Sequence, residues 1–369
     1  MIHVCEPNIG KKEFEYVKKC FDTNWISSMG PFVEKFEEKF AGFCDSKYGI
    51  TATSGTTALH LAVASLGIGK GDEVIMPTFT MIASANSVLY TGAMPVLVDS
   101  ELQTWNMDVT KIESKITDKT KAIMPVHTYG HPVDMDPLME LAEKYDLKVI
   151  EDVAEAHGAL YKGKKVGGIG DCGCFSFYAN KIITTGEGGM ITTNNDELNE
   201  MAHTLMNHAF SKEKHFWHQH IGFNYRMTNM QAALGLAQLE RIDELLKLRD
   251  RVTKLYTERL QDVDGITTPP HSPWAKNVVW MYGILIDEKE FGMNKDKLMI
   301  ELEKKGIETR EFFIPMHKQP VYTKMKLFSG DYPIAEELNY RGLYLPSGTL
   351  LTEEQIDFVC NTIKSLKKK

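Results

Sequence analysis

The chain lacks the features that mark membrane-spanning, exported and nucleic-acid-binding proteins. Its 369 residues contain no apolar run long enough to cross a bilayer, so no transmembrane helix is expected. The N-terminal stretch MIHVCEPNIGKKEFEYV has no basic region followed by an apolar one, so no secretory signal is expected. The net charge is −8, with both signs spread along the chain, which argues against a general binder of nucleic acids or membrane surfaces.

Cysteine is scarce, and its six residues show no disulfide framework, which fits a protein of the reducing cytoplasm. The one close pair, Cys172 and Cys174, has no second pair of ligands for zinc and is interpreted as small core or turn residues. The histidines of HFWHQH (His215, His218 and His220) do not have the spacing of a tetrahedral site, and we interpret this stretch as an aromatic-lined substrate loop. No metal site is expected.

Two glycine-rich nucleotide signatures are also missing. The complete signature G-x-x-x-x-G-K-[ST] does not occur, which argues against a P-loop enzyme. The glycines of VGGIGDCG neither follow a predicted strand nor open a helix, so a NAD-dependent sugar oxidoreductase is not supported. The chain has no long linker, low-complexity tract or internal repeat.

What the chain does contain is an alternation of strands and helices over its first two-thirds. The predicted strands are EVIMP, MPVLVD, KAIMPV and LKVIED, at residues 73–77, 94–99, 121–126 and 147–152. The clearest helix between them is DPLMELAEKYD, in which Asp136 can cap the first turn and Pro137 suits the first helical position. Strands separated by helices predict an α/β fold with a mostly parallel, doubly wound sheet.

The last third has a different pattern. From Thr228 the sequence TNMQAALGLAQLERIDELLKLRDRVTKLYTERL predicts one long helix, apolar in its first half and amphipathic in its second. The strand-like VVWMYGILID, a helix near KDKLMIELEKKG and a final helix from Thr352 indicate a smaller α+β unit. We therefore predict a large domain over residues 1–240 and a small C-terminal domain over residues 241–369.

Three short motifs suggest a cofactor site, and the first is YGITATSGTTALHLA. A strand is predicted to end at Ser54-Gly55-Thr56-Thr57, and a helix to begin at about Ala58. Hydroxyls and backbone N–H groups at a helix N-terminus bind anions, and a glycine lets the backbone approach the ligand. Taken alone, the motif fits an ordinary helix cap equally well.

The other two motifs supply a carboxylate and an amine. Asp152 ends the predicted strand of KVIEDVAEAHGA, at the edge of an α/β sheet where ligands bind, although a lone aspartate there more often caps a helix. Lys181 lies in FSFYANKIITTGEGGMITT between two apolar runs, where burial would lower the pKa of its amine, although an isolated lysine usually extends to the surface. A phosphate cup, a strand-end carboxylate and a buried amine together are the groups that pyridoxal 5'-phosphate (PLP) requires.

The order of these motifs resembles the DegT/DnrJ/EryC1 family of nucleotide-sugar aminotransferases. The resemblance rests on SGTTALHLA, PTFTMIASAN, VHTYG, VIEDVAEAHGA, FSFYANKIITTGEGG, GFNYRMTNMQAALGLAQLERID, GIETREFFIPMH and LYLPSG, and it extends from about residue 25 to about residue 350. It implies PLP fold type I, as in aspartate aminotransferase, with helices on both faces of the sheet and a smaller C-terminal α+β domain. It also implies a homodimer with shared active sites.

The resemblance further implies roles for single residues. Lys181 matches the lysine that forms a Schiff base with PLP, and Asp152 the partner of its pyridinium nitrogen. Glu155 falls beside the cofactor's 3-hydroxyl, where the family often has glutamine, and Met81 falls where an aromatic residue usually packs on the cofactor ring. The remaining cofactor residues by position are Gly55, Thr56, Thr57 and Ser176 at the phosphate, and Asn224, which would reach it from the other subunit.

The implied reaction moves an amino group from L-glutamate, through pyridoxamine phosphate, to C4 of a nucleotide-linked 4-keto-6-deoxy sugar. The acceptor expected from the resemblance is GDP-4-keto-6-deoxy-D-mannose, giving GDP-perosamine for a surface glycan such as the O-antigen of lipopolysaccharide. A dTDP- or UDP-linked sugar is the alternative, and a non-catalytic PLP-fold ligand sensor is a further one. The candidate substrate residues are Trp25, Gly30, Arg226, Arg310 and His317, and a surface ion pair is the alternative for Arg310.

Overall fold

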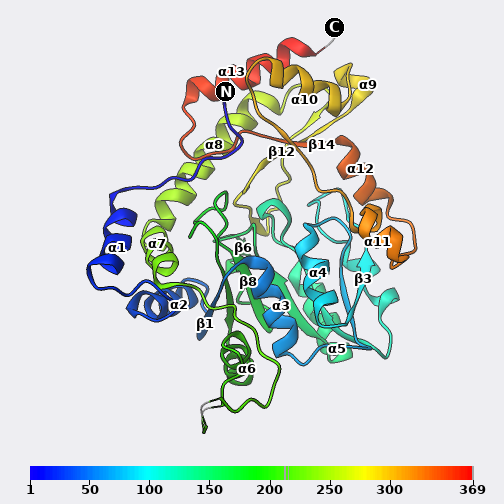
Figure 1. Ribbon diagram of the computed structural model, residues 1–369. Coiled ribbons are helices and arrows are strands. Elements are labelled where there is room, and N and C mark those ends of the chain that lie inside the picture. Colours follow the sequence, from blue (N-terminus) through cyan, green and yellow to red (C-terminus); the bar gives the residue numbers. More distant parts are fainter. Residues whose placement is uncertain (212, 215, 368–369) are drawn as a thin grey trace.

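The computed structural model describes residues 1–211, 213–214 and 216–367. In this described part, a seven-stranded sheet has the order β1-β9-β8-β5-β4-β2-β3. The labels β1, β8 and β3 mark it from left to right in Figure 1. β9 is antiparallel to both of its neighbours, and the other strands run parallel to one another, as the sequence predicted. The strands are β1 Tyr48–Ala52, β2 Glu73–Pro77, β3 Met94–Val98, β4 Thr120–Ile123, β5 Lys148–Asp152, β8 Cys172–Ser176 and β9 Gly189–Thr193.

Helices cover both faces of this sheet because its strands are apolar on both sides. Phe175 and Phe177 pack against Phe40 of α2, with ring centroids 4.8 and 5.1 Å apart. Successive strand residues point to opposite faces, so Ser176 faces the other side, where it meets Gly55 of α3. The helices of this part are α1 Lys11–Asp22, α2 Pro31–Phe43, α3 Gly55–Ser65, α4 Ile82–Tyr90, α5 Met135–Tyr145 and α6 Asp196–Met206, with 3-10 turns at Val109–Lys111, Glu113–Lys115 and Thr128–Gly130.

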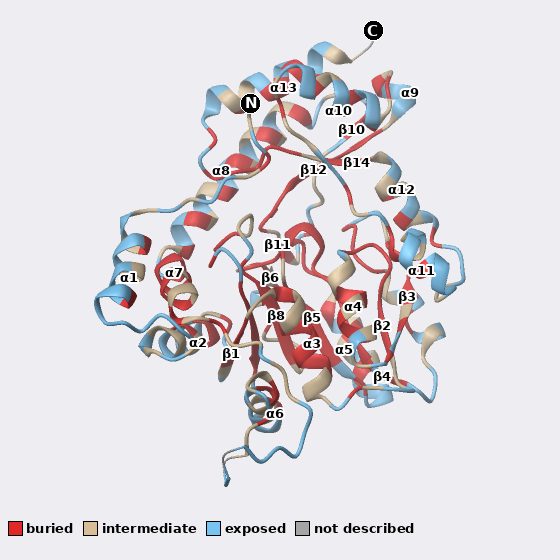
Figure 2. Cartoon of the chain, viewed as in Figure 1, coloured by how far each residue is buried: buried red, intermediate tan, exposed pale blue. Residues whose placement is uncertain are grey.

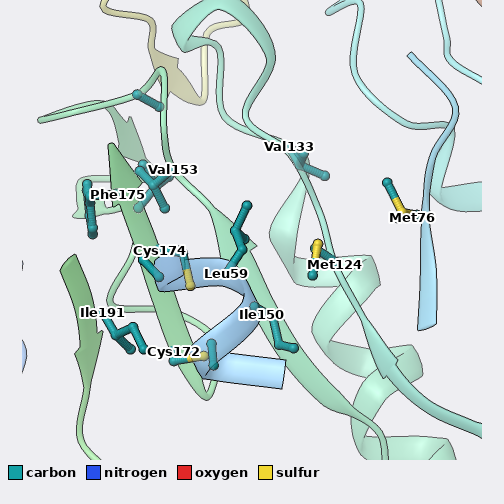
Figure 3. Packing of buried hydrophobic residues seen from close by; sticks show 14 of the residues in the cluster. Leu59, Met76, Met124, Val133, Ile150, Val153, Cys172, Cys174, Phe175 and Ile191 are labelled. Atoms are coloured by element: carbon teal, nitrogen blue, oxygen red, sulfur yellow. The ribbon is translucent and has the colours of Figure 1, made fainter. Parts of the chain in front are cut away.

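The core lies in the sheet itself, where most strand residues are buried, those of β8 and β9 along their whole length, and the outer helices keep exposed faces (Figure 2). Ile150, Cys172, Cys174 and Ile191 gather where β5, β8 and β9 run side by side (Figure 3). Both cysteines are fully buried here, which agrees with their interpretation as small core residues.

A second sheet forms the upper part of the molecule in Figure 1, with its own hydrophobic cluster. Its order is β10-β12-β14-β13, and all of its pairs are antiparallel. Its strands are β10 Ile266–Thr267, β12 Tyr282–Ile286, β13 Arg310–Glu311 and β14 Gly342–Leu345. The helices that follow residue 241 in the chain are α8 Ile242–Leu260, α9 Glu288–Phe291, α10 Lys295–Lys304, α11 Pro320–Met325, α12 Pro333–Arg341 and α13 Glu353–Leu366, with a 3-10 turn at Met316–Lys318.

The N-terminal arm, residues 1–8, ties this second sheet to the rest of the chain. Ile2 forms a parallel bridge with Ile307, and the N–H of Ser347 donates to the carbonyl of Val4. Farther along, the side-chain amide of Gln238 donates to the carbonyl of Asn8. A small third sheet joins β6 Leu160–Tyr161 to β7 Lys164–Lys165 and to β11 Ala275–Lys276.

The single long helix predicted from Thr228 is wrong: the structure breaks it into α7, Asn229–Leu239, and α8. Arg241 leaves the helical conformation at φ −113° and ψ 8°, and its guanidinium bonds the buried carboxylate of Glu13 at 2.7 Å. The break allows α7 to pack against α1 and α2 while α8 continues to the second sheet.

Two predicted helix starts also shift. α3 begins at Gly55 and not near Ala58, because the hydroxyl of Ser54 already caps the N–H of Thr57. α5 begins at Met135, so Asp136 lies inside its first turn and does not cap it. Across the described residues, no helix is both long and apolar enough to cross a membrane.

Candidate active site

The carboxyl ends of the parallel strands open into one cavity of about 370 Å³. The loops after β1, β2, β5 and β8 line one side of the cavity. Residues from the last third of the chain, in and beside the second sheet, line the other side. Its lining residues are Ser54, Gly55, Thr56, Leu59, Thr80, Met81, Ala83, Val126, Asp152, Ala154, Glu155, Ser176, Tyr178, Asn180, Lys181, Glu187, Trp280, Phe313 and Tyr344. The cavity thus unites seven predicted cofactor residues: Gly55, Thr56, Met81, Asp152, Glu155, Ser176 and Lys181.

One end of the cavity is the N-terminus of α3, which begins with Gly55 and Thr56. A side chain at Gly55 would place its Cβ 2.7 Å from the Cβ of Ser176, so only glycine lets the helix start come this close to β8. The first N–H groups of a helix have no partner within it, and they carry its positive partial charge. This end of the cavity is therefore suited to an anion such as a phosphate group.

Thr57 does not line the cavity, although it was predicted in the phosphate cup. Its hydroxyl donates to the carbonyl of Ser54 at 2.9 Å and accepts the N–H of Ser54 at 2.9 Å. The side chain therefore closes the helix cap. Its predicted contact with a phosphate stays a prediction.

Asp152 lies at the end of β5, buried in the cavity wall. Its Oδ2 accepts the hydroxyl of Ser84 at 2.8 Å, and its Oδ1 accepts the N–H of Ala154 at 3.1 Å. Burial raises the pKa of this carboxyl, whereas both hydrogen bonds and the nearby Lys181 lower it. Sequence reasoning missed Ser84, because serine in the helical stretch IASANSVLY has nothing to distinguish it from an ordinary helix residue.

The neighbouring Glu151 points to the opposite face and serves the fold. Its carboxylate accepts the N–H groups of Gly167, Ile169 and Gly170, each at 2.8 Å, and lies 3.1 Å from Nε2 of His127. Strand alternation therefore decides which of two adjacent acidic residues reaches the cavity.

Lys181 lies in the connection between β8 and β9, and its side chain is only 10% exposed. Its amine is 3.8 Å from Oε1 of Glu155 and 3.7 Å from the ring centroid of Trp280. Burial lowers the pKa of the amine, while Glu155 and Asp152 oppose this effect by favouring its charged form. The structure thus presents a buried amine whose proton can be lost more easily than that of a surface lysine.

Glu155 is buried beside this amine, and its Oε2 accepts the N–H of Tyr129 at 2.8 Å. Burial raises the pKa of the carboxyl to about 7, although Lys181 and the Tyr129 N–H both act to lower it. Glu155 is therefore poised between its neutral and its ionised form near neutral pH.

The raised pKa of Glu155 predicts a pH-dependent stability. The unfolded chain loses this proton near pH 4.5 and the folded chain near pH 7, so the folded state loses stability as pH rises between these values. In the cofactor-free protein, Glu155→Gln should gain up to about 3 kcal/mol of unfolding free energy relative to wild type across this window. Urea unfolding at a series of pH values measures the difference.

Glu113→Gln is the control, because Glu113 is an exposed carboxyl whose pKa is lowered by its bond to Lys144. Its stability relative to wild type should not rise over the same window. A constant difference between Glu155→Gln and wild type at every pH would show that Glu155 ionises at an ordinary pKa.

Aromatic side chains form the other wall of the cavity. Tyr178 comes from the loop that carries Lys181. Trp280 and Phe313 lie beside the second sheet, and Tyr344 lies in its strand β14. Met81 also lines the cavity, as expected, and its Sδ caps α4 by accepting the N–H of Ala83 at 3.0 Å. Sequence reasoning missed the four aromatic residues, because their motifs lie far apart in the chain and each alone reads as an ordinary apolar residue.

Six predicted residues lie elsewhere. Asn224 and Arg226 hydrogen-bond each other at 3.0 Å. Trp25 and Gly30 both lie against Asn229, whose side-chain amide donates to the carbonyl of Trp25. Arg310 forms a surface ion pair with Glu308 at 2.9 Å, and His317 is held between Thr78 and Glu336 at 2.8 and 3.0 Å. None of the six lines the cavity, and their contacts with substrate or cofactor stay predictions.

His215 lies outside the described residues. Among the described ones, no group of three or more His, Cys, Asp or Glu side chains is arranged to hold a metal ion.

The residues of the cavity fit PLP. The close approach of Gly55 to Ser176 forms a cradle for a phosphate, and Asp152 supplies a carboxylate for a ring nitrogen. Lys181 supplies a buried amine that can bond an aldehyde.

Comparison with known proteins agrees with this fit. Residues 7–364 match the DegT/DnrJ/EryC1/StrS aminotransferase family. The chain is 50% identical to a GDP-perosamine synthase of Caulobacter vibrioides over 359 residues, covering 97% of this chain and 96% of that protein. It is 46% identical to a GDP-perosamine synthase of Escherichia coli O157:H7 over 362 residues, covering 98% and 97%.

A solved structure shows the same fold with an aminated cofactor. The pyridoxamine phosphate form of the putative sugar aminotransferase Spr1654 from Streptococcus pneumoniae superposes with a TM-score of 0.94 at 28% identity, covering 99% of this chain and 97% of that one. The cofactor of this protein is accordingly PLP, and the fold is the α/β fold of PLP-dependent sugar aminotransferases. The chain belongs to the DegT/DnrJ/EryC1/StrS aminotransferase family.

Proposed function

We propose that the protein transfers the amino group of L-glutamate to C4 of GDP-4-keto-6-deoxy-D-mannose and so forms GDP-perosamine. The observation that carries this proposal is the 46–50% identity, over nearly the whole chain, to two proteins named GDP-perosamine synthase. The intact set of Lys181, Asp152, Gly55 and Ser176 in one cavity supports a catalytic protein and not a ligand sensor.

The cavity residues that we expect to bind the cofactor each have a definite task in this reaction. The N–H groups that open α3 and the hydroxyl of Ser176 hold the cofactor's phosphate. The carboxylate of Asp152, itself fixed by Ser84, keeps a proton on the ring nitrogen. When bound, PLP supplies a ring that accepts the charge developing at the substrate carbon.

Lys181 moves the proton. Its neutral Nζ would carry a proton from Cα of glutamate to the cofactor in the first half-reaction, and from the cofactor to C4 of the sugar in the second. Burial favours the neutral form that this step needs. Tyr178, Trp280 and Phe313 line the cavity around this amine.

We also propose that a second copy of the chain completes the site. Asn224 and Arg226 lie outside their own cavity on the segment 217–227, which is consistent with contacts to a neighbouring subunit. The same segment exposes Trp217 and Ile221, whose side chains are 55% and 90% accessible. Two copies that exchange this segment would each gain a polar side chain for the cofactor or the sugar.

A cofactor spectrum tests the proposed reaction. The purified enzyme is first aminated with glutamate, the donor is removed, and GDP-4-keto-6-deoxy-D-mannose is added. Prompt return of the yellow absorbance supports both the reaction and the GDP-linked acceptor. Loss of colour with glutamate but no return with this sugar would move the acceptor to a dTDP- or UDP-linked sugar, and no response to glutamate would overturn the proposal.

A further inference from the structure

Trp280 is a cavity residue that lies directly against Lys181. It lies just before β12, and its side chain is only 4% exposed. Its backbone N–H donates to the carbonyl of Tyr129 at 2.9 Å, and its ring stacks on that of Tyr129 with centroids 6.4 Å apart. Both contacts are with Tyr129, so they hold Trp280 independently of Lys181.

From this position Trp280 contacts the lysine loop twice. Its Nε1 donates to the carbonyl of Asn180 at 2.8 Å, and the amine of Lys181 lies 3.7 Å from its ring centroid. A tryptophan face attracts a cation through the negative charge of its π system, most strongly where water is excluded. One side chain thus holds both the backbone next to Lys181 and the Lys181 ammonium group.

We infer that Trp280 is a positioning residue for Lys181, whose ammonium it holds on the indole face while that amine is neither bonded to the cofactor nor transferring a proton. The inference rests on the assignment of Lys181 as the cofactor-bonding lysine and not on the identity of the acceptor sugar. The amine is free of the cofactor whenever the cofactor itself carries the amino group. A fixed place for it near the reacting atoms keeps it within reach for the proton transfers that follow.

The groups around Lys181 also shift the pKa of its amine. Asp152 and Glu155 face the amine from the end of β5, Cys5 faces it from the N-terminal arm, and the buried His157 lies close enough to sense its charge. The carboxylates favour the ammonium form, as the indole face does, and burial opposes it. Removing the indole should therefore shift Lys181 toward its neutral form.

Competitive acetylation of the cofactor-free protein tests the inference. Lys181 labelling with acetic anhydride is followed by peptide mass spectrometry across a pH series in wild type, Trp280→Leu and Trp280→Phe. The labelling profile of Trp280→Leu should move to lower pH by about one unit, and that of Trp280→Phe by less, because phenylalanine retains a weaker aromatic face. In the holoenzyme, kcat for the glutamate half-reaction should fall in the same order with little change in KM.

Trp274→Phe is the control, because Trp274 packs on Tyr161 and His131 away from the cavity, and its Lys181 profile should match wild type. A wild-type profile in Trp280→Leu would overturn the inference, whatever its kcat. If that variant does not fold, an unshifted profile in Trp280→Phe would overturn it equally. Neither donor nor sugar is present in the labelling, so its result is independent of the GDP-sugar assignment.

Discussion

Replacing Lys181 with alanine is expected to lower kcat by at least about 10³-fold while the protein still folds. By the proposed mechanism, the variant loses the group that bonds the cofactor and the amine that moves the proton, a contribution that is typically about 10²–10⁴-fold by itself. Folding should persist because burial disfavours the charged amine in the folded state, as its lowered pKa shows. Steady-state rates and a thermal unfolding curve of the variant measure the two effects.

Lys162→Ala provides the matched control. Lys162 is an exposed lysine that pairs with Asp136 at 2.6 Å, far from the cavity lining. Its loss should leave kcat within about twofold of wild type, because surface ion pairs contribute little. Near-normal turnover in Lys181→Ala would refute the role assigned to this lysine.

Asp152→Asn should have the second-largest effect, a decrease in kcat on the order of 10²–10³. An amide carries no charge to hold a proton on the ring nitrogen, so the cofactor accepts negative charge poorly. The same change should not destabilise the cofactor-free protein at neutral pH. Burial raises the pKa of Asp152, so its ionised form disfavours the folded state above that pKa, and asparagine removes this cost.

Unfolding by urea at pH 7, together with kcat, separates these two consequences. Asp136→Asn is the control, since Asp136 is an exposed aspartate whose pKa is lowered by Lys162. A large loss of stability in Asp152→Asn would show that its carboxylate supports the fold more than the cofactor. Unchanged kcat would remove Asp152 from the mechanism.

The parts of the fold that the sequence predicted well are those determined by local pattern. β2 Glu73–Pro77 has the bounds of the run EVIMP, and Thr352 caps α13 as the start of the final helix. The long helix failed at Arg241 because its break depends on Glu13, which lies more than 200 residues earlier in the chain. The predicted boundary between residues 240 and 241 falls at this break and stays a prediction.

The residues of the site also fall into those that local sequence pattern predicts and those that only distant contacts bring together. Gly55, Asp152 and Lys181 each follow directly from a strand end or a strand–strand connection, so motif and periodicity were enough to find them. Ser84 and Trp280 reach the cavity only because distant elements pack together, and nothing in their local sequence indicates it. The substrate contacts predicted for Arg310 and His317 stay predictions, because neither residue lines the cavity.

The antiparallel strand β9 has a consequence for the catalytic cycle. Because β8 and β9 pair along their whole length, the connection that carries Lys181 is anchored at both ends by the sheet. Within it, the N–H groups of Phe177, Lys181 and Thr185 bond carbonyls of the same connection or its base. The conformational entropy of ordering this loop is therefore lost once, when the chain folds, and not again at every turnover.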